Sequence, residues 1–271
     1  MPTLHALMLQ AWGLNVVLML VLWIVAVKSK NAGLVDIGWT LGMAVCVWYY
    51  AFLTDGLALR HWFLALGVSF WALRLVNHLL VRFISEGHED KRYQKIRADW
   101  KTGQDFKFFF FFQFQALLVV VLSICWLPSM QNTSPGFQIL ELAGVVIWII
   151  GFVGESVADH QLKAFKANAA NRGKTCQDGL WNYSRHPNYF FEWLIWFAYA
   201  VFALASPWGW VALFVPALMY YFLMHVSGVP LAEAQSLQSR GEEYRRYQQS
   251  TSIFIPLPKR RLYEVLGTIS E

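Results

Sequence analysis

Long apolar runs, separated by short polar stretches, constrain this chain more than any other feature. Runs of about 20 mostly apolar residues recur along it, long enough for an α-helix to cross the hydrocarbon core of a bilayer. A lipid-exposed segment must satisfy its own backbone hydrogen bonds, which favours helices. The composition agrees, because 57% of the residues are hydrophobic and only 14% are charged. The sequence therefore predicts an all-α polytopic membrane protein.

Seven runs are predicted to form a bundle of seven transmembrane helices. Together they use nearly the whole chain, so we expect one integral membrane domain over residues 1–271 and no separate soluble domain. Residues 1–27 lack the features of a cleaved signal peptide and are expected to be a retained first helix. The expected helices and tail are about 7–27, 34–53, 62–83, 108–127, 140–162, 189–205 and 208–226, followed by the polar tail 230–271.

The basic residues predict how these helices are oriented. With seven helices, 20 of the 22 Lys and Arg residues fall on one side of the membrane. Only Arg60 lies on the other side, and Arg74 lies within the third helix. The positive-inside rule then places the N-terminus outside and the C-terminus in the cytoplasm. The same rule explains the net charge of +5, so no nucleic-acid partner is expected.

The cysteines give no sign of a metal site. Cys46, Cys125 and Cys176 form neither a CxxC motif nor a Cys/His spacing typical of zinc ligands. We expect no metal and no disulfide.

A polar stretch at 178–192 interrupts two of the apolar runs. It carries Arg185, His186, Asn188 and Glu192 within eight residues. Ionisable groups at the mouth of a membrane helix indicate a functional site. The alternative is a loop whose Arg and His contact lipid headgroups.

Two acids precede this stretch on the fifth predicted helix. Glu155 and Asp159 are four residues apart and therefore share one helical face. This pattern indicates either a water- or ligand-filled cavity, or a structural pairing with Arg74 or Arg185.

Basic residues surround the expected cytoplasmic opening beside these acids. Arg and Lys side chains suit phosphate groups, so a nucleotide is a candidate ligand. Its base would contact Trp181, Tyr183 or Tyr189. No GxGxxG or Walker motif is present, and the positive-inside rule alone would also explain the charges. The basic residues are Lys163, Lys166, Arg172, Lys174 and Arg185.

The third predicted helix carries a polar stripe. Its members recur at spacings of three and four residues: Arg74, Asn77, His78 and Arg82. An arginine at this depth needs an anionic partner, and the candidates are Asp36, Glu155 and Glu192. A lone histidine such as His78 is more often a core residue than a proton donor.

Four motifs, in order along the chain, resemble one bacterial family. They are Val35-Asp36-Ile37-Gly38-Trp39, the stretch 89–97 (EDKRYQKIR), the stretch 179–189 (GLWNYSRHPNY) followed by Glu192 and Trp193, and Tyr244-Arg245-Arg246-Tyr247 with 251–256. The chain is identified as a member of the DUF1295 family, which is similar to the steroid 5-alpha-reductase-like membrane enzymes. This resemblance implies a bacterial inner-membrane enzyme with a cytoplasmic NADPH pocket.

The resemblance also implies which residues line the NADPH pocket. In the related reductases, an Asp and the basic residues after it hold the nucleotide, which corresponds to Asp159, Lys163 and Lys166 here. Their Gly-Leu-x-x-Tyr…Asn…Glu segment corresponds to Gly179, Leu180, Tyr183, Asn188 and Glu192. The complete expected set is Glu155, Asp159, Lys163, Lys166, Arg172, Tyr183, Arg185, His186, Asn188, Glu192 and Tyr247.

The expected reaction reduces a carbon–carbon double bond conjugated to a carbonyl in a lipid or steroid-like substrate. The related reductases donate the proton from a Tyr in a His-Tyr-x-x-Arg motif, but this chain has Leu79 at that position. The candidate catalytic residues are Asp36, Arg74 and His78. A sterol, a fatty acyl chain and an isoprenoid all fit the apolar interior equally well.

Two other interpretations remain. Arg185-His186-Pro187 also resembles the isoprenylcysteine and phospholipid methyltransferases, which use S-adenosylmethionine. Their C-terminal pattern would correspond to Glu233, Glu242, Glu243, Tyr244, Tyr247 and Ile255-Pro256. Asn188, and Asp159 with its trailing lysines, favour the reductase. A lipid-binding or scaffolding protein would have no use for the cytoplasmic cluster.

Overall fold

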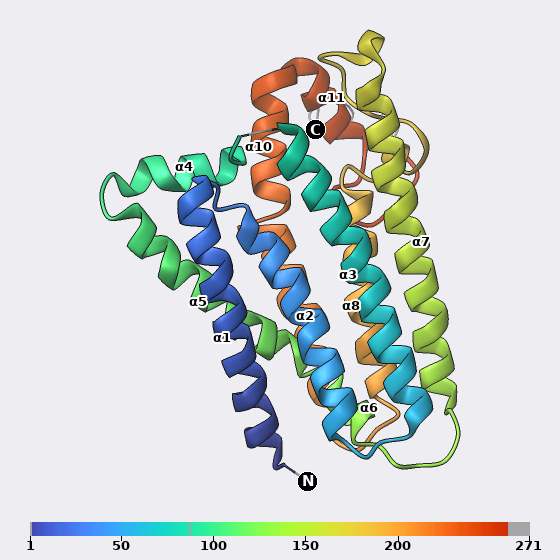
Figure 1. Cartoon of the computed structure of the whole chain (residues 1–271). Coiled ribbons are helices and arrows are strands. Elements are labelled where there is room, and N and C mark those ends of the chain that lie inside the picture. Colours follow the sequence, from blue (N-terminus) through green and yellow to red (C-terminus); the bar gives the residue numbers. More distant parts are fainter. Residues whose placement is uncertain (1, 87, 260–271) are drawn as a thin grey trace, which may run out of the picture. The chain divides into compact units, whose positions relative to one another are not determined.

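The fold is helical throughout the part of the chain that can be described. The computed structural model describes residues 2–86 and 88–259, and within them we find helices and a single isolated β-bridge, between Ser184 and Ser252. The side chain of Arg82 and the end of the predicted tail lie outside the described residues. The chain forms two compact units, each described here by itself (Figure 1).

Unit 1 comprises residues 1–137 and 206–211. Helix α2 packs against α1, α3 and α5, and α1 also packs against α5. The helices of unit 1 are α1 (Leu4–Ser29), α2 (Leu34–Leu53), α3 (Ala58–Glu86), α4 (Lys91–Trp100), α5 (Gln104–Ser123) and α6 (Leu127–Met130).

Unit 2 comprises residues 138–205 and 212–271. Its most extensive packing is between α7 and α8. Its helices are α7 (Ile139–Ala167), η1 (Ala169–Asn171), η2 (Gly179–Asn182), α8 (Pro187–Ala203), α9 (Phe214–Tyr221), the π-helix η4 (Phe222–Val226), α10 (Val229–Arg240) and α11 (Glu242–Ser250); the 3-10 helix η3 (Gly209–Leu213) contains the boundary between the units.

Six helical segments in the described residues are long and apolar enough to cross a membrane. They are consistent with an integral membrane protein, as the sequence predicts. The sixth predicted span forms α8, which has 17 residues and is not one of the six. The segments are Leu4–Ser29, Leu34–Leu53, Ala58–Val81, Gln104–Ser123, Ile139–Ala167 and Gly209–Arg240.

The structure also corrects stretches that the sequence analysis treats as polar connections or tail. Part of the segment between the third and fourth predicted helices forms α4, and the start of the following turn forms α6. The tail folds into α10 and α11. Half of the residues of α4 are charged, so its sequence has too few apolar residues to resemble a membrane span. The helix is capped at its N-terminus by Asp90, which accepts a hydrogen bond from Arg92 N at 2.7 Å.

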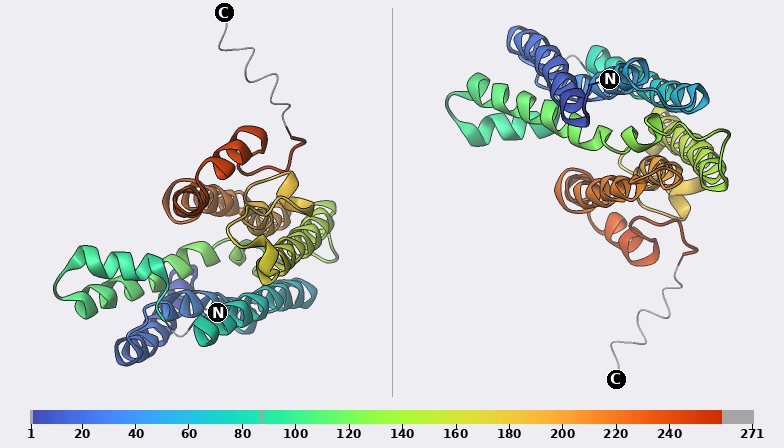
Figure 2. Two further views of the ribbon diagram at one scale, coloured as in Figure 1. Left: turned by 90° about the horizontal axis from the view of Figure 1, so that it is seen from above. Right: turned by 90° about the horizontal axis from the view of Figure 1, so that it is seen from below.

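Helix α4 and the start of α5 form a hairpin within unit 1. Figures 1 and 2 show the two helices projecting to one side of the C-terminal end of α1. Trp100 packs edge-on against Phe108, with ring centroids 4.8 Å apart, and Tyr93 also contacts Phe108. These contacts between aromatic rings hold the hairpin closed.

At the opposite end of α1 and α2, a buried arginine ties a loop to α3. Arg60 is fully buried and donates to the carbonyl oxygens of Asn132, Ser134 and Gly136 at 2.7–3.0 Å. Three backbone oxygens therefore accept hydrogen bonds from the guanidinium group of Arg60.

Candidate functional site

In unit 2, glycines on α7 allow α8 to approach closely. A Cβ at Gly154 would lie 2.4 Å from the Phe191 ring, and one at Gly151 would lie 2.9 Å from Ile195. Any larger residue at these positions would push α8 away. The close packing brings the C-terminal half of α7 beside the first turns of α8, where the predicted site residues lie.

Polar side chains from both helices meet at this point. Asn188 Nδ2 donates to Asp159 Oδ1 at 3.3 Å. Glu155 lies one turn before Asp159 and is buried, with 6% of its surface exposed. Glu192 lies one turn after Asn188 and accepts a hydrogen bond from Trp196 Nε1 at 2.9 Å. The structure thus joins the acid of α7 to the amide of α8.

Basic side chains follow these polar groups along the chain. Lys163 and Lys166 are exposed on the last turns of α7, and Arg172 is exposed in the segment after it. Tyr183 is 46% exposed.

Arg185 and His186, in contrast, are buried in a cluster around one carboxylate. Glu233 of α10 accepts from Arg185 Nε at 2.8 Å and from Tyr244 OH at 2.9 Å, and His186 Nε2 lies 3.0 Å from the same oxygen. Gln248 donates to the other oxygen of Glu233. Four side chains therefore converge on Glu233, a residue that the sequence analysis named only for the methyltransferase.

Backbone contacts strengthen this attachment of the tail. Arg185 Nη1 donates to the carbonyl oxygens of Gln248 and Thr251 at 2.8 and 2.7 Å. Ser184 Oγ donates to Phe254 O at 2.7 Å. Tyr247 donates to Trp181 O and Ser184 O, and burial raises the pKa of its phenol, so that the group stays protonated and keeps donating. These contacts attach the tail to residues 181–185 of the polar stretch 178–192.

In unit 1, Asp36 lies in a second polar cluster. Tyr93 OH donates to Asp36 Oδ1 at 2.7 Å, and Arg92 Nη2 donates to Oδ2 at 3.0 Å. Arg92 also pairs with Asp90 at 3.2 Å. Both carboxylate oxygens of Asp36 therefore accept hydrogen bonds. One of the two donors is the hydroxyl of Tyr93, which lies beside this acid of α2.

The next residues of the same motif anchor α4 to the start of α2. Glu89 is buried and accepts from Ala32 N at 2.8 Å and from Arg97 Nη2 at 2.9 Å. The carboxylate beside it raises the pKa of the Arg97 guanidinium above its ordinary value. The motif 89–97 thus has a structural role that its resemblance alone did not reveal.

The other predicted catalytic residues lie on α3. His78 is exposed and Arg74 is half-buried. Leu79 and Phe83, on the same helix, line a pocket with Asp36, Asn31, Gly33, His88 and Asp90. The sequence analysis missed Tyr93 as a partner of Asp36, and the acid–basic–aromatic pattern of residues 90–93 is the signal that could have indicated it.

The six apolar helices and the two polar clusters define a helical protein of the membrane type. The chain belongs to the family described as "Protein of unknown function (DUF1295)", which it matches over residues 22–251. This finding confirms the family predicted from the four motifs.

Two curated proteins are similar to parts of the chain. It is 34% identical over 73 residues to "Probable O-methyltransferase ustE" of Ustilaginoidea virens, which covers 26% of each chain. It is 26% identical over 213 residues to "Uncharacterized protein C594.04c" of Schizosaccharomyces pombe, which covers 69% of this chain and 62% of that protein. The chain thus spans less than two thirds of the length of either relative. No solved structure matches it significantly.

Proposed function

We propose that this protein is a membrane-embedded, NADPH-dependent reductase that acts on a carbon–carbon double bond conjugated to a carbonyl in a lipid or steroid-like substrate. In this proposal it is one of the steroid 5-alpha-reductase-like enzymes. The observation that carries the proposal is the hydrogen bond from Asn188 to Asp159. It joins the two helices that carry the nucleotide motif of that family.

The chemistry of the residues around this bond suits a phosphorylated dinucleotide. The carboxylates of Glu155, Asp159 and Glu192 can accept hydrogen bonds from ribose hydroxyls or a carboxamide, and the amide of Asn188 can both donate and accept. Lys163 and Lys166 are exposed one and two turns beyond Asp159, where they can pair with phosphate groups. Arg172 and Tyr183 complete the exposed part of the proposed site.

Three residues of the proposed site would position the nucleotide-binding residues without contacting the nucleotide themselves. Arg185, His186 and Tyr247 are each at least nine-tenths buried and are bonded to Glu233 or to main-chain oxygens. We assign them the role of holding residues 181–188 so that Asn188 faces the nucleotide. The resemblance alone had suggested that they contact it directly.

The candidate catalytic residues Asp36, Arg74 and His78 would supply the proton. A bound nicotinamide cofactor supplies the hydride to the β-carbon, and the developing enolate oxygen then needs a hydrogen-bond donor in a dry pocket. Arg74 and His78 of α3 can donate. The structure adds Tyr93, whose hydroxyl is bonded to Asp36, so that Asp36 can orient the phenol.

A labelled hydride tests the reaction directly. The protein is placed in nanodiscs made from extracted membrane lipids, with NADPH deuterated at the nicotinamide C4. Reduction predicts lipids that gain one deuterium and one proton across a former double bond, seen by mass spectrometry. If no lipid acquires deuterium while NADPH is bound, the reductase proposal is wrong.

The same proposal includes a topology of seven spans in a bacterial inner membrane, with the N-terminus outside and the C-terminus cytoplasmic. Helix α8 has 17 residues, at the lower end of the lengths that cross a bilayer. Counting it as a span keeps the basic residues on one side. An even number of spans would divide them between the two sides.

A methyltransferase is the second candidate function, and the match to ustE is the observation that favours it. Its cofactor would be S-adenosylmethionine. His186 and Glu233 would belong to that site, but in this structure their side chains are bonded to each other. Asp159 and Asn188 have no assigned role in this alternative.

A further inference from the structure

Helix α4 has two different faces. Tyr93, Ile96 and Trp100 lie on the face that packs into the core of unit 1 with α5. Lys91, Lys95 and Ala98 lie on the other face and are exposed. Since residues three and four apart share a helical face, α4 is amphipathic, with aromatic and aliphatic groups inward and lysines outward.

Exposed lysines from three elements gather at this end of unit 1. Two hydrogen bonds join the segments that carry these lysines: Ala32 N donates to Glu89 Oε1 at 2.8 Å, and Trp23 Nε1 donates to Asp105 O at 2.9 Å. They therefore lie around the junction of α1, α4 and α5. We call them the lysine rim: Lys28, Lys30, Lys91, Lys95, Lys101 and Lys107.

Few acidic groups oppose this rim. In the described residues 28–36 and 88–107, the exposed acidic side chains are Asp99 and Asp105, and Asp105 lies 3.5 Å from Arg97. Glu89, by contrast, is buried. The outer surface of the hairpin therefore has an excess of positive charge.

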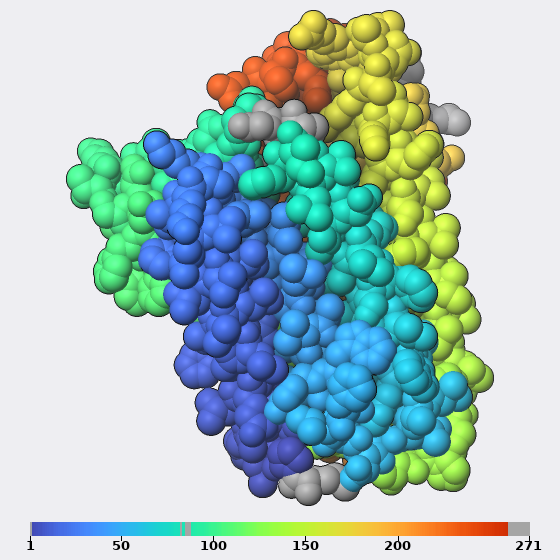
Figure 3. Space-filling model, in the orientation of Figure 1, coloured from blue at the N-terminus to red at the C-terminus, as the bar shows by residue number. Residues whose placement is uncertain are grey.

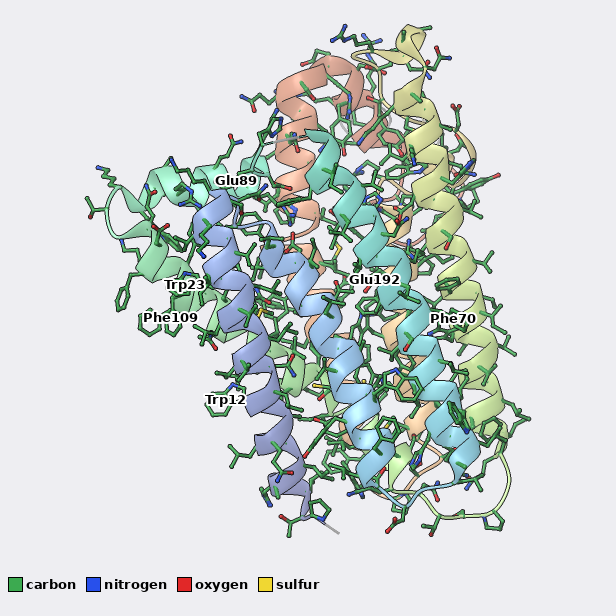
Figure 4. The ribbon with its side chains drawn as sticks, viewed as in Figure 1. Trp12, Trp23, Phe70, Glu89, Phe109 and Glu192 are labelled. Carbon is green, nitrogen blue, oxygen red and sulfur yellow. The ribbon has the colours of Figure 1, made fainter. Side chains whose placement is uncertain are left out.

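Four aromatic rings, two of them half-buried and two exposed, lie next to the lysine rim. Trp23 and Phe109 pack edge-on with centroids 5.3 Å apart, and Figure 4 shows both beside α1, below α4. Phe106 and Phe110 are 67% and 57% exposed. Tryptophan and other aromatic rings collect where lipid tails meet headgroups, so these rings mark a depth in the membrane just below the lysines.

We propose that the α4–α5 hairpin lies in the membrane interface and binds acidic phospholipids through the lysine rim. The aromatic rings would enter the headgroup–acyl boundary, and the lysines would pair with headgroup phosphates. Figure 3 shows the hairpin standing out from α1 and α2, with its outer surface uncovered by the rest of unit 1. The partner is the membrane surface, and the site is independent of the proposed nucleotide site.

The test compares two lipids at α4. A fluorophore is attached to the variant Ala98→Cys, whose position is exposed, while the three native cysteines are buried. The protein is placed in nanodiscs of equal amounts of phosphatidylglycerol and phosphatidylcholine, and either lipid carries a spin-label quencher. We expect preferential quenching by phosphatidylglycerol, which should weaken as salt is raised.

Charge variants show whether the rim is responsible. The double variant Lys91→Gln, Lys95→Gln should lower the preference by about fivefold for each lysine. The pair Lys91→Arg, Lys95→Arg should keep it. The matched control Lys174→Gln, Lys259→Gln removes two exposed lysines from unit 2 and should leave it unchanged. Equal quenching by both lipids, an equal loss in the control, or a loss in the arginine variant would overturn the proposal.

Discussion

Asn188 and Glu192 are four residues apart and lie on one face of α8. Their partners in the structure are Asp159 and Trp196. The variant Asn188→Leu keeps the volume but loses both the donor and the acceptor, and Glu192→Gln keeps the shape but loses the charge. If both residues contact the nucleotide, each variant should lower NADPH affinity by about tenfold or more, as expected for a lost hydrogen bond to a charged or polar ligand group.

Stability measured on the same detergent samples separates this outcome from a structural role. A Glu192 that only neutralises a buried cation predicts that Glu192→Gln lowers the melting temperature. Nucleotide affinity in the folded fraction would then stay normal. That result would remove Glu192 from the proposed site.

The hydrogen bond between Tyr93 and Asp36 can be tested by its contribution to stability. Its hydroxyl donates to Asp36 and its ring is almost fully buried. Tyr93→Phe should cost about 1.5–3 kcal/mol of unfolding free energy, the range for a hydrogen bond to a charged group. Tyr183→Phe is the control, because Tyr183 lies outside the candidate spans and is 46% exposed. Equal losses of unfolding free energy in the two variants would mean that the hydrogen bond from Tyr93 to Asp36 adds no measurable stability.

Among the elements, α10 and α11 are joined by several hydrogen bonds to the polar stretch 178–192. Glu233 of α10 accepts from Arg185 and Tyr244 and contacts His186, and 13% of its side chain is exposed. Glu233→Gln leaves the buried Arg185 cation without its carboxylate. We expect a loss of about 3–5 kcal/mol, the cost of breaking a buried ion pair, measured by thermal or denaturant unfolding.

The control at this scale is Glu242→Gln on α11. Glu242 pairs with Arg245 at 2.8 Å, but both side chains are more than 60% exposed. Such surface pairs contribute about 0–1 kcal/mol. If the two glutamate variants are equally stable, the tail does not hold the motif in place.

How much the sequence predicted also depends on the element. The apolar runs predicted α1, α2, α3, α5 and α7, because burial in lipid requires about 20 apolar residues in succession. Helices α4 and α11 are short and charged, and they form because tyrosines on one face pack inward. A pattern based on apolar length does not detect such helices.

For the candidate site, spacing predicts contacts only between residues that are close in sequence. The common face of Asn188 and Glu192 follows from helical spacing, whereas their choice, like that of Asp159, follows from the family resemblance. Tyr93 and Glu233 are 57 and 47 residues from their partners Asp36 and His186. Only the folded chain reveals such pairs, because neither spacing nor composition determines which turns meet.

For the whole molecule, topology is the property that labelling can test. The seven-span proposal places the loop after α6 outside and the segment after α7 in the cytoplasm. Thr133 and Ala170 suit labelling because both are exposed, whereas the neighbouring Asn132 is buried and would not react. A cysteine introduced at position 133 should react with an impermeant reagent from outside intact cells, and one at position 170 should react only after lysis. The reverse pattern would contradict the topology.

The central claim is that the cluster of Asp159, Asn188 and Glu192 binds NADPH. The most direct measurement titrates the detergent-solubilised protein with NADPH and, in parallel, with S-adenosylmethionine, and follows binding by calorimetry. The account predicts saturable binding of NADPH that is lost in Asn188→Leu, and no binding of S-adenosylmethionine. Saturable binding of S-adenosylmethionine, with none of NADPH, would contradict the reductase and support the methyltransferase.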